Sequence, residues 1–139
     1  MTRRVLTVVA AALFDAEGRV LLAQRPPGKA MAGLWEFPGG KLEPGETPEA
    51  ALARELREEL SITVNETQMA PLTFASHAYE DFHLLMPLFG CWTWEGDLEP
   101  VEGQTLAWAE PSSLFDFPAP EADVPLFEYL ASGQGARRR

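Results

Sequence analysis

Runs of apolar residues, separated by short breaks rich in glycine and proline, divide most of the chain into strand-length segments. The apolar segment 5–14 predicts a buried first strand, because it is too short to cross a membrane. Residues 15–18 predict a turn, after which 20–24 reads as a second strand that we expect to pair with the first in a hairpin. Further strands are predicted over 34–37, 72–78, 82–94 and 106–109, with a loop over 25–33 and a break in strand structure at 38–40.

One segment has the period of a helix instead. Leu52, Leu56 and Leu60 recur at every fourth position and predict a helix with one buried stripe. Thr47 followed by Pro48 is a typical helix start, a hydroxyl N-cap and then proline in the first turn. Shorter helices are predicted over 112–115 and 122–130. Strands and helices interspersed in this way favour an α/β or α+β fold with a mixed sheet.

Length and charge limit the classes of function. The 139 residues suit one domain, which we place at 1–134, with a flexible basic tail at 135–139. The net charge of −10 argues against a nucleic acid polymer as partner, since such binding needs cations to neutralise phosphates. No apolar run is long enough for a membrane span. The single cysteine, Cys91, excludes an internal disulfide and suits the cytoplasm, and its apolar neighbours predict a buried thiol. Both a monomer and a homodimer remain open.

The predicted long helix carries an unusual group of acids. Glu55, Glu58 and Glu59 follow an i, i+3, i+4 spacing, which places them side by side on one helix surface. Their mutual repulsion would become attraction around a hard divalent cation that prefers oxygen ligands, such as Mg²⁺ or, in its place, Mn²⁺.

The residues around this helix resemble the Nudix box of the Nudix hydrolases. The match runs through Gly40, Glu46, Arg54, Glu55, Leu56, Glu58, Glu59 and Ile62 at the family's spacing. The one departure is Ser61, where the family has a glycine at the helix end. A serine there costs about 1 kcal/mol if the backbone is left-handed. Segments 34–41, 94–96, 102–104 and 117–126 also resemble MutT-type members.

This resemblance implies the Nudix fold, a mixed sheet sandwiched between helices. It also implies hydrolysis of a nucleoside triphosphate to the monophosphate and pyrophosphate. The implied metal ligands are Glu55, Glu58, Glu59 and the backbone carbonyl of Gly39. Glu102 is implied as a further ligand or as the general base, and Arg54 as the residue that orients Glu58.

The substrate contacts are less closely specified by the resemblance. Arg25 and Lys41 are candidates to bind phosphates, and Tyr79 to flank the base. Asp123 stands where MutT reads the base with an asparagine, although an aspartate could instead cap the last helix. The substrate is therefore either an oxidised purine such as 8-oxo-dGTP, or a CTP-like pyrimidine or another nucleoside diphosphate derivative. A non-catalytic Nudix module is disfavoured because every box carboxylate is present.

Overall fold

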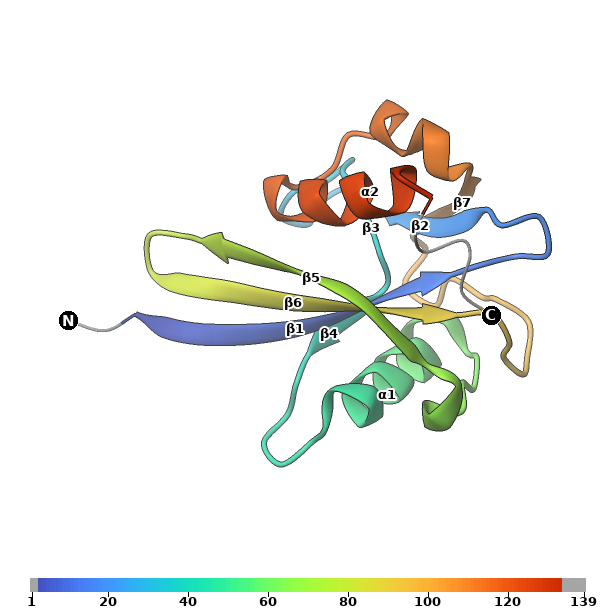
Figure 1. Ribbon diagram of the computed structural model, residues 1–139, viewed down its shortest axis with the longest axis horizontal. Coiled ribbons are helices and arrows are strands. Elements are labelled where there is room, and N and C mark those ends of the chain that lie inside the picture. Colours follow the sequence, from blue (N-terminus) through green and yellow to red (C-terminus); the bar gives the residue numbers. More distant parts are fainter. Residues whose placement is uncertain (1–2, 134–139) are drawn as a thin grey trace.

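Two sheets and two helices make up the computed structural model, which describes residues 3–133. The proposed tail 135–139 lies outside the described residues. Helix α1 covers one face of the larger sheet and α2 lies on its other side (Figure 1). The larger sheet contains β1 (Arg4–Leu13), β4 (Gly39–Lys41), β5 (Ala70–Ala78) and β6 (Phe82–Cys91); the smaller contains β2 (Val20–Gln24), β3 (Trp35–Glu36) and β7 (Thr105–Ala109); the helices are α1 (Pro48–Leu60) and α2 (Val124–Ala131).

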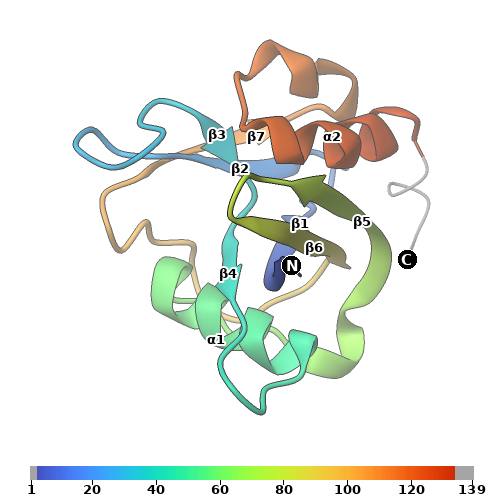
Figure 2. The ribbon, with the colours of Figure 1, turned by 90° about the vertical axis from the view of Figure 1, so that its left-hand side faces the viewer.

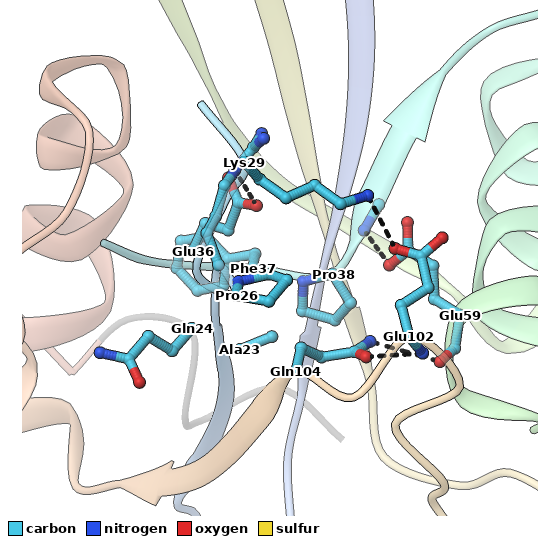
Figure 3. Close-up of a pocket in the computed structure, with 12 residues that line it drawn as sticks. Ala23, Gln24, Pro26, Lys29, Glu36, Phe37, Pro38, Glu59, Glu102 and Gln104 are labelled. Carbon is cyan, nitrogen blue, oxygen red and sulfur yellow. Dashed lines mark hydrogen bonds and ion pairs between the residues drawn. The ribbon is translucent and has the colours of Figure 1, made fainter. Parts of the chain in front are cut away.

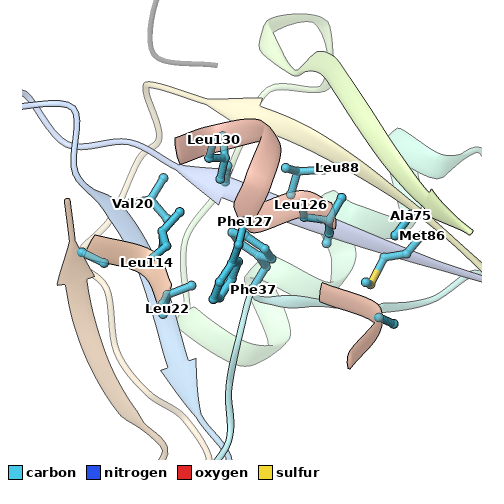
Figure 4. Close-up of a cluster of buried hydrophobic side chains, with 14 of the residues drawn as sticks. Val20, Leu22, Phe37, Ala75, Met86, Leu88, Leu114, Leu126, Phe127 and Leu130 are labelled. Atoms are coloured by element: carbon cyan, nitrogen blue, oxygen red, sulfur yellow. The ribbon is translucent and has the colours of Figure 1, made fainter. Parts of the chain in front are cut away.

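Strand β1 lies inside the larger sheet, whose order is β4-β1-β6-β5. It runs parallel to β6 and antiparallel to β4, so the sheet is mixed, as expected. Its apolar run is continuous because both faces are buried. One set of alternating side chains packs towards α1 and the other towards α2; the sets are Val9, Ala11 and Leu13, and Ala10, Ala12 and Phe14. Figure 4 shows the cluster on the α2 side, where Leu126 and Phe127 of α2 pack in one core with Leu88 of β6.

The predicted hairpin between the first two strands is wrong. The turn after β1 forms, with the Asp15 carboxylate accepting the amide N–H groups of Glu17 and Arg19. Beyond it, however, β1 and β2 share one isolated bridge, between Phe14 and Val20, and belong to different sheets (Figure 2). Both edges of β1 are already hydrogen-bonded, to β4 and β6, so β2 pairs with β3 and β7 instead.

The predicted break after 34–37 is confirmed, since β3 ends at Glu36 and residues 37–38 belong to no strand. A strand was not predicted directly after it, but Gly39–Lys41 forms β4 along the edge of β1 in the other sheet. Gly39 has φ +155°, and a Cβ there would collide with the backbone oxygen of Val9. Only glycine lets the two backbones approach this closely. This pairing places β4, which contains Gly40 of the box, directly beside α1.

The remaining predicted elements form, with shifted ends. Strand β6 stops at Cys91 and not at 94, since its register with β1 ends where Leu13 pairs with Cys91. The helices expected at 112–115 and 122–130 are the 3₁₀ turn Pro111–Asp116 and, after a second 3₁₀ turn at Glu121–Asp123, α2. A further 3₁₀ turn, Glu66–Gln68, was not predicted. Cys91 is buried as expected, and this burial raises the pKa of its thiol to about 12.

Helix α1 begins and ends where the sequence predicts. The Thr47 side chain caps it by accepting the amide N–H of Ala50, and Leu52, Leu56 and Leu60 are all fully buried. Ser61 closes the helix in the left-handed conformation, at φ 62° and ψ 30°, and donates its amide N–H to the carbonyl of Arg57.

Substitution of Ser61 by glycine is expected to raise the free energy of unfolding by about 1 kcal/mol, because glycine adopts this conformation without a Cβ penalty. Urea denaturation measures the change. Ser61→Ala keeps the Cβ and serves as the control, for which no gain is expected. A Ser61→Gly protein no more stable than the alanine variant would contradict the prediction.

Candidate active site

Strand β4 and helix α1 together form the surface that carries the box residues. Where β4 passes α1, the Gly39 amide N–H faces Glu59 Oε1 at 3.4 Å. At Gly40 the approach is closer, because a Cβ there would overlap the carboxyl group of Glu55. Glycine at position 40 therefore leaves room for the Glu55 carboxylate against the strand backbone.

Arg54 is the centre of an ion-pair network on this surface. Its Nε lies 2.7 Å from Glu46 Oε2 and its Nη2 lies 2.9 Å from Glu46 Oε1, a two-point contact. Nη1 reaches Glu55 Oε2 at 3.1 Å and Glu58 Oε1 at 3.5 Å, and Nη2 donates to the Lys41 carbonyl at 3.1 Å. The hydrogen bonds that Glu46 accepts from Arg54, and then the one from the Glu43 amide N–H, lower its pKa to about 2. Arg54 thus binds Glu46 and Glu55 more closely than Glu58, the partner expected from the sequence.

The three helix carboxylates occupy different environments. Glu59 is half-buried, and its pKa is raised, first by that burial and then by the adjacent Glu55 carboxyl group. The side chain of Glu58 is 60% exposed, whereas that of Glu55 is 17% exposed. Within residues 3–133 no three Asp, Glu, His or Cys side chains are arranged closely enough to hold a metal ion. The oxygen donors are present at one surface, where Glu55 and Glu58 accept hydrogen bonds from Arg54 and Glu59 accepts one from the Gly39 amide N–H.

A cavity of about 190 Å³ opens beside Glu59. Arg25 and Lys29 contribute cations to its wall, and Glu36, Glu59 and Glu102 contribute carboxylates (Figure 3). Glu102 lies on the loop before β7, and its Oε1 is 3.9 Å from the Lys29 ammonium. Four polar residues of this wall were not predicted as site residues, because no local sequence pattern shows which side chains face the cavity; they are Gln24, Lys29, Glu36 and Gln104.

A second cavity, of about 230 Å³, contains Lys41 and Asp123. It shares four residues with the first, so the two cavities are neighbours; these are Arg25, Glu36, Phe37 and Gly39. Asp123 is 5% exposed. Burial, together with the nearby charge of Glu36, raises the pKa of its carboxyl group to about 7. It stands at the N-cap position of α2, but its side chain makes no capping hydrogen bond.

Tyr79 lies at the edge of this region and is not among the described residues that line the two cavities. Its ring stacks on Phe82 and meets His77 edge-on, at centroid distances of 4.9 and 4.8 Å. The charges of Asp123 and Glu121 contribute, after burial, to raising the pKa of its hydroxyl. The structure thus places Tyr79 near Asp123 but in an aromatic cluster outside the cavity walls.

Comparison with known proteins identifies the family of this chain. The family model of the NUDIX domain matches residues 9–129. The CTP pyrophosphohydrolase of Escherichia coli K12 is 40% identical over 132 residues, 93% of this chain and 94% of the relative. The 8-oxo-dGTP diphosphatase of Proteus vulgaris is 42% identical over 103 residues, 74% of this chain and 90% of the relative.

Solved structures lead to the same family. The solution structure of the E. coli ORF135 protein has a TM-score of 0.84 at 35% identity, covering 97% of this chain and 94% of that one. A MutT structure from work on Aliivibrio salmonicida and Vibrio cholerae has a TM-score of 0.79 at 29% identity, with 94% and 99% covered. No helix among the described residues is long and apolar enough to cross a membrane. With a family model spanning most of its length and relatives that match it nearly end to end, the chain belongs to the NUDIX domain family and is a Nudix hydrolase.

Proposed function

We propose that this protein is a Mg²⁺-dependent nucleoside triphosphate pyrophosphohydrolase, which releases pyrophosphate and a monophosphate and removes oxidised nucleotides such as 8-oxo-dGTP. The observation that carries the proposal is the pair of adjoining cavities, one beside the box carboxylates and one containing a buried aspartate. Their shared wall suits a substrate with phosphates at one end and a base at the other. Relatives of this chain include an 8-oxo-dGTP diphosphatase.

Nudix hydrolases generally need a divalent metal ion. In the proposed reaction Glu55, Glu58, Glu59 and the Gly39 carbonyl hold Mg²⁺, for which Mn²⁺ can substitute. The bound metal supplies charge neutralisation on the phosphates and a water of lowered pKa. The raised pKa of Glu59 fits this role. Beside Glu55 its carboxyl group favours a bound proton, and a metal cation in the same place would neutralise the two carboxylates instead. Glu102, at the mouth of the same cavity, is the further ligand or the general base.

The cations of the cavity walls are assigned to the phosphates. Arg25 borders both cavities, and Lys41 borders the one that contains Asp123. Lys29 also borders the first cavity. The net charge of −10 supports a free nucleotide over a nucleic acid polymer as substrate. We propose that the enzyme acts as a monomer or a homodimer.

Asp123 is the proposed base-reading residue. When ionised it accepts hydrogen bonds, for example from the N1–H and amino group of guanine or the amino group of cytosine. A pKa of about 7 makes both protonation states accessible near neutral pH. A CTP-like pyrimidine is therefore the second candidate substrate, and the 40% identical CTP pyrophosphohydrolase supports it.

The deciding experiment is a nucleotide panel with Mg²⁺, in which pyrophosphate release from 8-oxo-dGTP, dGTP, CTP and dCTP is followed. We expect cleavage of at least one nucleotide, with kcat/KM for 8-oxo-dGTP well above that for dGTP. Equal values for these two would reject removal of oxidised guanine, and preferred cleavage of CTP would select the second candidate. A panel in which no nucleotide is cleaved would end the proposal.

The Asp123→Asn variant tests base reading directly. Asparagine keeps the size of the side chain but both donates and accepts at any pH, so the ranking of bases should change by about tenfold in kcat/KM while kcat on the preferred substrate changes less. The same panel, run at pH 6 and pH 8, measures the ranking. An unchanged ranking at both pH values would leave Asp123 with a structural role only.

A further inference from the structure

The wall between the two cavities contains an ion pair that the Nudix box does not include. Arg25 directly follows β2 and Glu36 lies on β3, and these two strands pair antiparallel. Arg25 Nε is 2.8 Å from Glu36 Oε2, and Nη2 is 3.4 Å from Glu36 Oε1. Both residues line both cavities. The pair therefore lies at the junction of the proposed phosphate and base sites.

The geometry of this pair fixes the direction of the guanidinium. Two of its nitrogens face Glu36, so the plane of the group is set by the strand that carries this carboxylate. Within residues 3–133 Nη1 has no hydrogen-bond partner, so its two N–H groups are left for another acceptor. The backbone pairing of β2 with β3 in turn holds the carboxylate, since Ala23 and Glu36 are register partners. An arginine held in this way loses little conformational freedom when a phosphate binds.

Charge alone argues against a carboxylate at this place. A nucleoside triphosphate carries several negative charges, and Glu36 would repel it. The first cavity already contains Glu59 and Glu102 in addition to Glu36. A third carboxylate in the wall is therefore unfavourable for the substrate unless its hydrogen bonds to Arg25 contribute more than its repulsion removes.

We propose that Glu36 is a positioning residue for the nucleotide, which holds the Arg25 guanidinium in the wall shared by the two cavities so that its free N–H groups meet the phosphates. The inference rests on the proposed function, because it assumes a phosphorylated substrate in these cavities. Glu36 then has two opposite effects on nucleotide binding: it strengthens binding by holding Arg25 and weakens binding by repelling the phosphates.

The test is a double-mutant cycle between Arg25 and Glu36, with KM measured for CTP and 8-oxo-dGTP. Glu36→Gln keeps the shape and one acceptor, and Glu36→Met removes both acceptors. With Arg25 present, KM should rise about tenfold in the Glu36→Met variant and less in the Glu36→Gln variant. A rise of about tenfold is the size expected when hydrogen bonds between charged groups are lost. The change in kcat should be smaller than the change in KM. In the Arg25→Ala background the same substitutions should lower KM, because only the repulsion remains.

This reversal of sign distinguishes positioning from a merely structural role, which would raise KM in both backgrounds. Glu17→Gln is the matched control, since Glu17 pairs with Arg19 at 3.3 Å and is not among the residues that line the two cavities. Thermal unfolding midpoints of all variants show whether each one folds. A fall or no change in KM when Glu36 alone is replaced would overturn the inference, as would a further rise in the Arg25→Ala background. Loss of the proposed function is recognised separately, because the wild-type protein would then cleave neither nucleotide.

Discussion

Substitution of Glu58 by glutamine is expected to reduce kcat by roughly two to four orders of magnitude while leaving the fold intact, the range typical for loss of one positioned acid–base or metal-binding group. Glutamine keeps the length of the side chain but loses the charge that a divalent cation requires. The side chain is 60% exposed, and its contact with Arg54 is 3.5 Å long, so little stability depends on it. The free energy of unfolding should change by less than about 0.5 kcal/mol.

The measurement is kcat with saturating nucleotide over a range of Mg²⁺ concentrations, beside a urea denaturation curve. Glu128→Gln, a similarly exposed carboxylate on α2, is the matched control and should retain full activity. A Glu58→Gln enzyme with kcat within about threefold of wild type would remove Glu58 from the proposed metal site. Recovery of activity at high Mg²⁺ would identify weakened metal binding as the cause of the loss.

Helix α1 was predictable because all its signals are local. Thr47, Pro48 and the leucine stripe lie within one short segment, and each reports on neighbours a few residues away. The pairing of β1 was not predictable in this way. Its partners, β4 and β6, are distant in the sequence, and nothing in the segment 5–14 indicates that both its edges are taken. The turn at Asp15 is a local signal that favours a hairpin, but the pairing of β1 with β4 and β6 leaves only one bridge between β1 and β2.

The residues of the candidate site show the same difference between local and long-range signals. The box residues lie on β4, on α1 and in the short segments directly beside α1, so their spacing identified them, and the matching family confirms the fold around them. Lys29 reaches the cavity wall from a loop and Glu36 from a two-residue strand. Neither segment is long enough to show a hydrophobic period, so the sequence pattern could not identify these two residues. The role of Tyr79 beside the base stays a prediction; its ring packs against Phe82 and His77.

Substitution of Gly40 by alanine is expected to lower kcat by about a hundredfold with only a moderate loss of stability. The new Cβ would overlap the carboxyl group of Glu55, and this group is the mobile end of a side chain, so it moves while the backbone stays. A displacement of about 1 Å in a group that positions the reaction can reduce the rate by about two orders of magnitude. Glu55 is also held by Arg54 Nη1 at 3.1 Å, so its movement would disturb the ion-pair network as well.

The matched control is Gly90→Ala on β6, where a Cβ would press on the Trp92 ring, which is not among the residues lining the two cavities. Both variants place a methyl group against a side chain, and both are expected to lose about 1–3 kcal/mol of stability from overpacking. Only Gly40→Ala should also lose kcat. Rates and unfolding curves for the two proteins therefore separate crowding of a strand from displacement of Glu55. If Gly40→Ala kept wild-type kcat, the place of Glu55 against β4 would be irrelevant to the reaction, and the metal would have to be held by Glu58, Glu59 and Glu102 without it.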